Sequence, residues 1–436
     1  MKFLRKPINN VITTYEKFIQ YEASAGIILL FVTILALVFS NSYLSDFYFS
    51  LWNTKFIIGF ENFYLEKPLI LWINDGLMAI FFLLVGLEIK REILVGELSQ
   101  IKQAVLPIGA AIGGMVFPAL CFFLLEIEAL DGWAIPMATD IAFSLGILKL
   151  LGNRIPLSLK VFLTAFAIID DIGAVIIIAL FYTSNLNIIL LAIALLIILL
   201  LILFNYWNIT HLAFYLLPGI VLWLLFLKAG IHPTIAAVIL AFTIPAKPKV
   251  EIMDFLSDLE YTKKIFENTT HREKEILLSH KQYDALEDLN TSIELVQSPI
   301  QKLEHRLHGL VSYFIMPLFA FSNAGVIIKP ETFGNLSISI SVSLVAGKLI
   351  GILLGTYLFM YIFKANLPEN TTFKQMIGIG FLGGVGFTMS LFINNLAYTE
   401  NLLLDQARIG ILLGSSISGI LGYFILLFSS KEINKV

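Results

Sequence analysis

Five ionisable side chains fall inside long apolar segments of the chain, more than one helical turn from either end: Asp75, Asp140, Asp170, Asp171 and Lys348. If those segments span a bilayer, each unpaired charge costs ~2.5–3.5 kcal/mol at mid-membrane depth, or on the order of 12–18 kcal/mol for all five. Such side chains therefore need a partner, water, or a function in moving ions.

Asp170 and Asp171 are adjacent, so on a helix their side chains point about 100° apart and cannot easily share one partner. Lys348 is the one basic residue deep in an apolar segment. The simplest arrangement pairs Lys348 with Asp170 and leaves the other carboxylate to bind a mobile ion. One lysine cannot neutralise two aspartates, which disfavours a purely structural role for both.

A desolvated carboxyl group can hold a proton into the cellular pH range, because burial raises its pKa by as much as ~3–5 units. The same group, once deprotonated, is an oxygen ligand for a hard cation such as Na⁺. Asp171 and Asp140 are the carboxylates expected to ligate transported Na⁺. Competition between H⁺ and Na⁺ for one carboxylate is sufficient for exchange of the two ions.

Two apolar segments contain residues that break a helix at membrane depth. Pro136 lies just before Asp140, and the stretch Gly378–Thr388 is too rich in glycine for a regular helix. Irregular backbone at this depth must be buried in protein or line an aqueous cavity.

The ends of such half-helices carry partial charges of about +0.5 and −0.5, which Asp140 and Lys348 are placed to neutralise. For Asp140 this dipole-balancing role and direct ion ligation are equally supported. Thr139 can ligate an ion through its hydroxyl, although a threonine in a span more often bonds to backbone.

The composition supports a membrane bundle around these residues. Of 436 residues, 58% are hydrophobic and 14% charged, and the mean hydropathy is +0.86; soluble domains carry about 25% charged residues. A span needs ~20 apolar residues. We therefore predict an all-α polytopic membrane protein with one transporter domain over residues 1–436. Its twelve spans are predicted at about 22–40, 69–89, 103–125, 134–151, 157–182, 187–204, 211–227, 230–245, 309–328, 336–363, 374–397 and 405–429.

The distribution of basic residues predicts the orientation. Twelve spans place both termini on one side, and that side holds 23 of the 29 Lys and Arg residues, against five on the other side. The positive-inside rule then puts the N- and C-termini in the cytoplasm of a bacterial inner membrane. The formal net charge of −3 indicates no nucleic-acid partner.

Two segments outside the spans stand apart. Residues 42–68 mix aromatic and polar side chains and predict a periplasmic β-hairpin, an exposed edge that favours pairing into a homodimer. Residues 246–300 hold 7 basic and 11 acidic residues with helical spacing of apolar ones, and predict a partly helical cytoplasmic insertion.

Each half of the chain has one broken span between regular ones. Spans three to five and spans ten to twelve enter the membrane in opposite directions, which is typical of an inverted repeat.

Several ordered motifs over nearly the whole chain resemble the NhaA family of sodium/proton antiporters. They are Leu71–Glu92, Gly132–Gly146, Ala167–Tyr182, Leu303–His308, Pro317–Val326, Gly347–Lys348 and Gly383–Ser390. The resemblance implies an NhaA-like fold, in which two discontinuous helices cross mid-membrane. It also implies an electrogenic antiporter that extrudes Na⁺ and also Li⁺ for a larger number of H⁺ and is switched on at alkaline cytoplasmic pH.

The resemblance also implies roles for single residues. Asp171 is expected to carry the ion and the proton, Asp170 to pair with Lys348, and Asp140 with Thr139 to lie where the broken helices cross. Asp75 is expected on the periplasmic side as an interfacial charge. A set of charged and histidine residues is expected to form a cytoplasmic funnel that responds to pH, although a solvated rim would look the same: Glu88, Arg91, Glu92, Glu304, His305 and His308. His232 also resembles a pH-response position of the family, and a satisfied core histidine is an equally good interpretation of it.

Two other classes of membrane protein can use buried carboxylates. An intramembrane aspartyl protease lacks a role for Lys348 and for twelve spans, and its Gly-x-Gly-Asp pattern is absent from the sequence. A passive cation channel usually builds rings of carbonyls or charges by oligomer symmetry. We therefore expect a transporter, not an enzyme, with Na⁺ and H⁺ as partners and no cofactor. Proton coupling is the observation that separates it from a channel.

Overall fold

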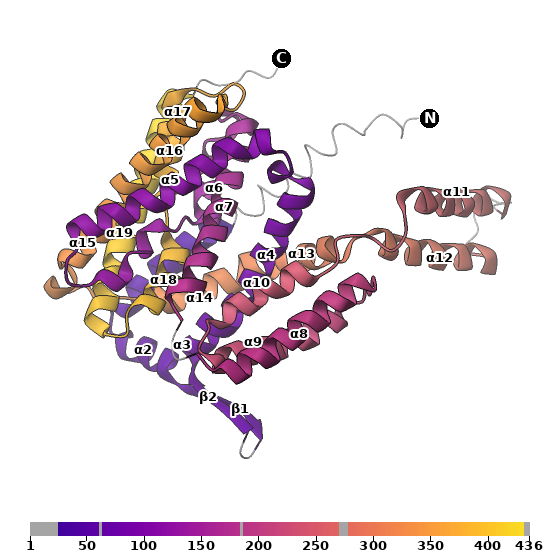
Figure 1. Cartoon of the computed structure of the whole chain (residues 1–436), viewed down its shortest axis with the longest axis horizontal. Coiled ribbons are helices and arrows are strands. Elements are labelled where there is room, and N and C mark those ends of the chain that lie inside the picture. The colour runs from indigo at the N-terminus through magenta and orange to yellow at the C-terminus, as the bar shows by residue number, and fades with distance from the viewer. Residues whose placement is uncertain (1–24, 61–62, 184–185, 270–277, 431–436) are drawn as a thin grey trace.

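The computed structural model describes the chain except residues 1–24, 61–62, 184–185, 270–277 and 431–436. The start of the first predicted span and both predicted cytoplasmic termini lie outside the described residues. Within them the chain is almost entirely helical, with one small β-hairpin at one end of the bundle and a helical pair projecting from its side (Figure 1).

Every predicted span is helical over most of its described part. Seven helical segments are long and apolar enough to cross a membrane, or up to nine with two bent pairs counted, among the residues described. The continuous helices are Ala25–Ser40, α4 (Met78–Val95), α5 (Ile101–Leu125), α6 (Ile141–Leu150), α7 (Leu157–Phe181), α8 (Ile188–Tyr206), α9 (Ala213–Ala229), α10 (Pro233–Thr243) and α19 (Asn401–Ser429).

Several spans are interrupted, including those that contain α4 and α6. α13 (Pro299–Leu310) continues through the π-helical stretch Val311–Ile315 into α14 (Met316–Asn323), and α15 (Asn335–Val342) continues through Ser343–Gly347 into α16 (Lys348–Phe363). α4 is likewise preceded by α3 (Leu69–Leu71) and a π-helical stretch at Trp72–Leu77. π-bulges often occur at functional sites.

Both predicted helix breaks are present. Span four consists of a 3₁₀ turn at Ile135–Met137, extended backbone at Ala138 and Asp140, and then α6. Span eleven consists of α17 (Phe373–Gly383) and α18 (Phe387–Ala397), bent by 40° at the intervening glycines.

α5 and α16 pack against each other closely enough to require glycine. A Cβ added to Gly113 would lie 2.0 Å from the carbonyl oxygen of Gly351, and one added to Gly355 would lie 2.1 Å from that of Gly109. Small residues allow such close approach between helices in membranes. This contact fixes α16, and with it Lys348, against α5 and the neighbouring α7.

The predicted hairpin at 42–68 is wrong in its first part. The strands are β1 (Lys55–Phe60) and β2 (Phe63–Pro68), antiparallel with Lys55 opposite Pro68, whereas α2 (Ser45–Asn53) is helical. Tyr48 and Trp52, spaced four residues apart, are buried on one face of α2 and meet the ring of Phe321 edge-on. Helical burial of this face overrides the local pattern of aromatic residues.

The charged insertion contains α11 (Ile252–Thr269) and α12 (His280–Val296), which lie side by side and project from the bundle (Figure 1). The helix that contains the ninth predicted span, 309–328, begins before that span, at Pro299. The hydroxyl of Ser298 accepts a hydrogen bond from the amide of Gln301 at 3.3 Å and caps it. Glu304 and His308 therefore lie on a helix that continues into the ninth span.

Candidate ion-binding site

The two broken spans cross and are hydrogen-bonded to each other at their breaks. The amide of Asp140 donates to the carbonyl of Val385 at 2.6 Å, and the hydroxyl of Thr139 donates to that of Gly383 at 2.9 Å. In return, the hydroxyl of Ser390 donates to the carbonyl of Ile135 at 2.8 Å. The bonds run in both directions, so the breaks satisfy each other's backbone groups at membrane depth.

Asp140 lies at the N-terminal ends of both second half-helices. One carboxylate oxygen accepts from the amide of Phe143 on α6 at 3.0 Å. The other accepts from the amide of Thr388 on α18 at 3.1 Å and from its hydroxyl at 2.6 Å. Asp140 is buried, so its negative charge faces two positive helix ends in a water-poor region.

Lys348 lies at the C-terminal end of a half-helix, where the partial charge is negative. Its ammonium contacts both oxygens of Asp170, at 2.9 and 3.0 Å, and donates to the carbonyl of Met137. Met137 closes the 3₁₀ half of span four, where backbone carbonyls are unsatisfied and carry partial negative charge. The side chains of Lys348 and Asp170 are 0% and 1% exposed, so the pair is shielded from water. The predicted ion pair is present, and its lysine also neutralises a half-helix end.

Asp171 points to different surroundings from its neighbour. It lines a cavity of about 40 Å³ together with Thr139, Asp140 and Thr388 of the crossing. A water needs ~10–15 Å³ of such volume, so the cavity has room for a partly hydrated small cation. No group of three or more His, Cys, Asp or Glu side chains gathers as a metal site within the part of the chain that the structure describes. Ligands beyond the two carboxylates would therefore be hydroxyl, backbone or water oxygens.

Glu88 and His308 line the same cavity as Asp171. One turn from Glu88 on α4, Arg91 pairs with Glu304 at 2.6 Å and with Glu92 at 2.9 Å. We call Arg91, Glu92 and Glu304 the rim cluster. The structure thus brings most of the residues predicted to respond to pH to one end of the cavity, with His305 exposed beside them.

Burial shifts the pKa of Glu304 in the rim cluster and of His308 beside it. Both residues precede the predicted ninth span, 309–328, in the sequence. Burial raises the pKa of Glu304 above its ordinary value, although the facing Arg91 opposes the shift. Burial, together with the positive charges of Arg91 and His305, lowers the pKa of His308.

His232 lies apart from the rim cluster. Its ring lies 3.7 Å from the Asp75 carboxylate, which also pairs with Lys67 at 2.7 Å. α10 begins beside Asp75 with His232 as its N-cap, and at its other end Lys90 donates to the carbonyl of Ile244 at 2.5 Å. Since α10 has 11 residues, ~16 Å of helix separates His232 from the end near the rim cluster.

An amide network joins the π-helical stretch Trp72–Leu77, α14 and α18 and was not predicted from the sequence. Asn74 and Asn323 exchange side-chain hydrogen bonds at 3.2 and 2.9 Å, and Asn395 donates to Asn323 at 2.8 Å. Thr388, which donates to Asp140, was also not singled out. The available signal was an amide or hydroxyl in an apolar run, which is also what an ordinary interhelical hydrogen bond looks like.

Comparison with known proteins decides the family. The family model described as Na⁺/H⁺ antiporter 1 matches residues 16–426, almost the whole chain. The chain belongs to this family. A relative named Na(+)/H(+) antiporter NhaA from Oleidesulfovibrio alaskensis is 44% identical, over 97% of this chain and 95% of its own. Proteins of the same name from Phocaeicola vulgatus and Sulfurimonas denitrificans are 44% and 43% identical, over 97% and 99% of this chain and 97% and 98% of their own lengths. With its apolar helices, this membership makes the chain a multi-pass membrane protein of the NhaA type.

Proposed function

We propose that this NhaA-family chain is an electrogenic Na⁺/H⁺ antiporter in which Asp171 binds either a proton or Na⁺ and is exposed alternately to the two sides of the membrane. The observation that carries the proposal is the separation of two adjacent carboxylates. Asp170 is engaged by Lys348 at 2.9 Å, whereas Asp171 lines the small cavity. A buried carboxylate that faces a space large enough for a small cation is suited to exchange.

Asp140 is placed both to balance the half-helix ends and to supply an oxygen to bound Na⁺. Its three hydrogen bonds hold it in place at the crossing and support the first role. Its position on the cavity wall beside Asp171 supports the second. The hydroxyl of Thr139 donates to a backbone carbonyl, but its oxygen keeps a lone pair that can face a cation.

The same cavity supports competition between the ions. Na⁺ binding needs a deprotonated Asp171, and protonation of Asp171 removes the charge that holds Na⁺. Lys348 and Asp140 keep the two half-helix ends neutral in either state, so the exchange does not leave an uncompensated dipole in the membrane. Two or more protons entering per Na⁺ or Li⁺ would make transport electrogenic. No cofactor is needed, and the activity is that of a secondary transporter.

Regulation by pH is proposed to act through the rim cluster together with Glu88, His305 and His308. Protonation of Glu304 would weaken its pairing with Arg91, one helical turn from Glu88 and His308, which line the cavity of Asp171. His232 and Asp75 are proposed to influence the opposite, periplasmic side.

The distribution of basic residues supports a bacterial inner-membrane location with both termini in the cytoplasm and the hairpin in the periplasm. We also propose a homodimer formed through β1 and β2, because Ile57, Ile58 and Tyr64 are more than half exposed on this two-stranded sheet and its edges are free to pair. Replacing Ile57 by Lys should convert the dimer to a monomer in size-exclusion chromatography with light scattering. An unchanged mass would place the dimer contact elsewhere.

The decisive experiment uses everted vesicles with an imposed pH gradient. Adding Na⁺ should collapse the gradient for the wild type, and Asp171→Asn should abolish the response. Asp284→Asn is the matched control, since this aspartate is exposed on α12 outside the bundle. Full exchange by Asp171→Asn, or Na⁺ binding by the purified protein without proton release, would refute the site assignment.

A further inference from the structure

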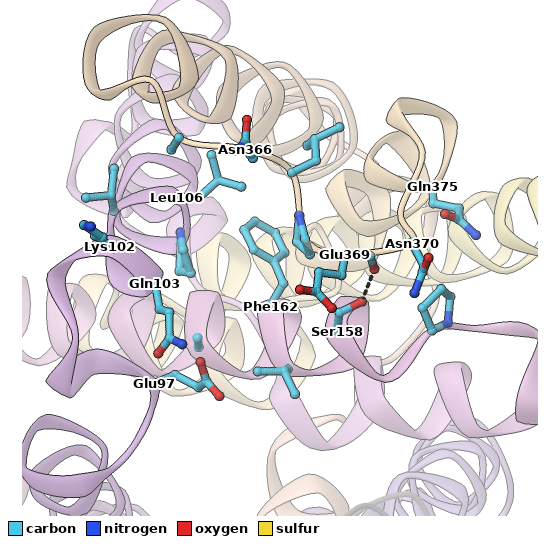
Figure 2. A pocket seen from close by; sticks show the side chains of 18 of the residues that line it. Glu97, Lys102, Gln103, Leu106, Ser158, Phe162, Asn366, Glu369, Asn370 and Gln375 are labelled. Atoms are coloured by element: carbon cyan, nitrogen blue, oxygen red, sulfur yellow. Dashed lines mark hydrogen bonds between the residues drawn. The ribbon is translucent and has the colours of Figure 1, made fainter.

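A second and much larger cavity opens at the end of the bundle that holds the loops between α4 and α5, α6 and α7, and α16 and α17. Its volume is about 1670 Å³, above the ≈ 300–1,000 Å³ typical of small-molecule sites. It does not include Asp171, Asp140 or the rim cluster. Figure 2 shows Lys102 and Asn370 on opposite sides of it, with Leu106 and Phe162 between them.

The inner part of this cavity is apolar. Leu106 on α5 and Phe162 and Ala165 on α7 line it and are themselves almost fully buried in the bundle. Leu157 also lines it at the start of α7. Eight residues of helix separate Leu157 from Ala165, so the cavity reaches ~12 Å along α7. That depth exceeds the headgroup layer of ~5–8 Å on each side of a bilayer and enters the hydrocarbon.

The outer part of the cavity carries charge. Lys102, Arg154 and Lys364 line it, together with the carboxylates of Glu97 and Glu369. Burial and the neighbouring Glu92 raise the pKa of Glu97. The backbone of Glu369 is held by Ser158, whose hydroxyl donates to its carbonyl at 2.5 Å. The rim therefore presents three cations from three separate segments, the start of α5, the link between α6 and α7 and the link after α16, against two carboxylates.

The wall beside the rim is suited to contact with lipid. Ile101 and Phe363 line the cavity and are 82% and 57% exposed. Exposed aliphatic and aromatic side chains next to lysines are typical of the membrane–water interface, where lysine ammonium groups reach the headgroups. The cavity thus runs from a basic rim at headgroup level to an apolar interior at acyl-chain level.

We infer that this cavity is a binding site for an anionic phospholipid, whose phosphate lies among Lys102, Arg154 and Lys364 and whose acyl chain lies against Leu106 and Phe162. Basic pockets between transmembrane helices on the cytoplasmic side are a general means of holding such headgroups. The charge of the rim disfavours zwitterionic lipids, and the apolar interior disfavours a free inorganic anion.

The site lies among α5, α7, α16 and α17, which carry Asp170, Lys348 and one half of the crossing. A lipid held here would brace the ends of these helices. The lipid would influence transport through these helices and would not contact the transported ions.

The test is native mass spectrometry of the full-length protein in detergent, titrated with phosphatidylglycerol or with phosphatidylcholine of the same chain length. The wild type should retain phosphatidylglycerol preferentially. The variant Lys102→Ala/Lys364→Ala should weaken retention about 30-fold, since each basic residue near an anionic headgroup contributes on the order of a five-fold factor. Lys263→Ala/Lys264→Ala is the control with the same charge change, on exposed residues of α11. It should leave retention unchanged.

A second variant tests the apolar interior. Val161→Trp adds bulk within the cavity and should reduce phosphatidylglycerol retention while unfolding at the wild-type temperature. Equal retention of the two lipids, or retention unaffected by Lys102→Ala/Lys364→Ala, would overturn the inference. Displacement of bound phosphatidylglycerol by an equal concentration of inorganic phosphate would instead show a site for a free anion and would also overturn it.

Discussion

Removing the ammonium of Lys348 should be among the most costly single changes in the chain. Lys348→Met leaves the buried carboxylate of Asp170 without its partner at 2.9 Å, a loss of ~3–5 kcal/mol for a broken buried pair. It also leaves the Met137 carbonyl without its donor, a further ~1–3 kcal/mol. Replacing both partners, as Asp170→Leu/Lys348→Met, removes both charges, so only the carbonyl cost should remain.

The expected order of thermal unfolding in one detergent at one pH is therefore wild type, then the double variant, then Lys348→Met, the least stable. Lys374→Met, at an exposed position on α17, is the matched control and should change stability by less than about 0.5 kcal/mol. A double variant as unstable as the sum of its two single variants would show that the two side chains act independently, and the reasoning would fail. Transport by Lys348→Ala that is unchanged at every pH would likewise argue against the pairing.

Three further variants have defined outcomes. His308→Gln should flatten the pH dependence of thermal unfolding between about pH 7.5 and 5.5. The pKa of this histidine is lowered in the folded state, so as pH falls the unfolded chain binds the proton before the folded chain does. The wild type therefore loses stability as pH falls below about 6.5. An equal slope for both proteins would contradict this. Thr388→Val removes a 2.6 Å hydrogen bond to Asp140 and should cost ~1–3 kcal/mol, and Na⁺ binding measured by calorimetry should weaken; unchanged affinity would separate this hydroxyl from the site. Gly351→Ala forces a Cβ to within 2.2 Å of a carbonyl oxygen of α5 and should destabilise by ~1–3 kcal/mol, whereas Gly309→Ala, with open space around it, should not; similar unfolding temperatures would mean the helices separate easily.

The fold was largely predictable, because hydrophobic thickness and helix geometry constrain a membrane bundle strongly. Pro136 correctly located the first break, and the glycine-rich stretch Gly378–Thr388 contains the second, although its first part, up to Gly383, is a regular helix. The helix at Ser45–Asn53 was missed because its aromatic run resembles a strand, and only tertiary contact with Phe321 shows that one face is buried. The π-helical stretches were also beyond sequence reasoning, since a single inserted residue leaves the hydropathy pattern intact.

The site was predictable where charge balance leaves few options. One buried lysine and two adjacent aspartates predict that one aspartate pairs directly with the lysine, and the geometry assigns that pair to Asp170. The two roles weighed for Asp140 were not separable by sequence, because they depend on which helix ends face it. The position of His232, 3.7 Å from the Asp75 carboxylate, could not be predicted from its local sequence, because it depends on how α10 packs against the π-helical stretch Trp72–Leu77.

The arrangement connects the rim cluster to the cavity that Asp171 lines. Glu88 lines the cavity of Asp171, and Arg91 of the rim cluster follows it by three residues on α4, a rise of ~4.5 Å. His308 lines the same cavity, four residues after Glu304 on α13. The ion pair between α4 and α13 is thus one helical turn from the cavity on both helices. The π-helical stretch Val311–Ile315 follows His308 after two residues. We therefore expect pH to act by changing how α4 and α13 lie against each other, which alters access to Asp171, while the pair of Asp170 and Lys348 stays fixed.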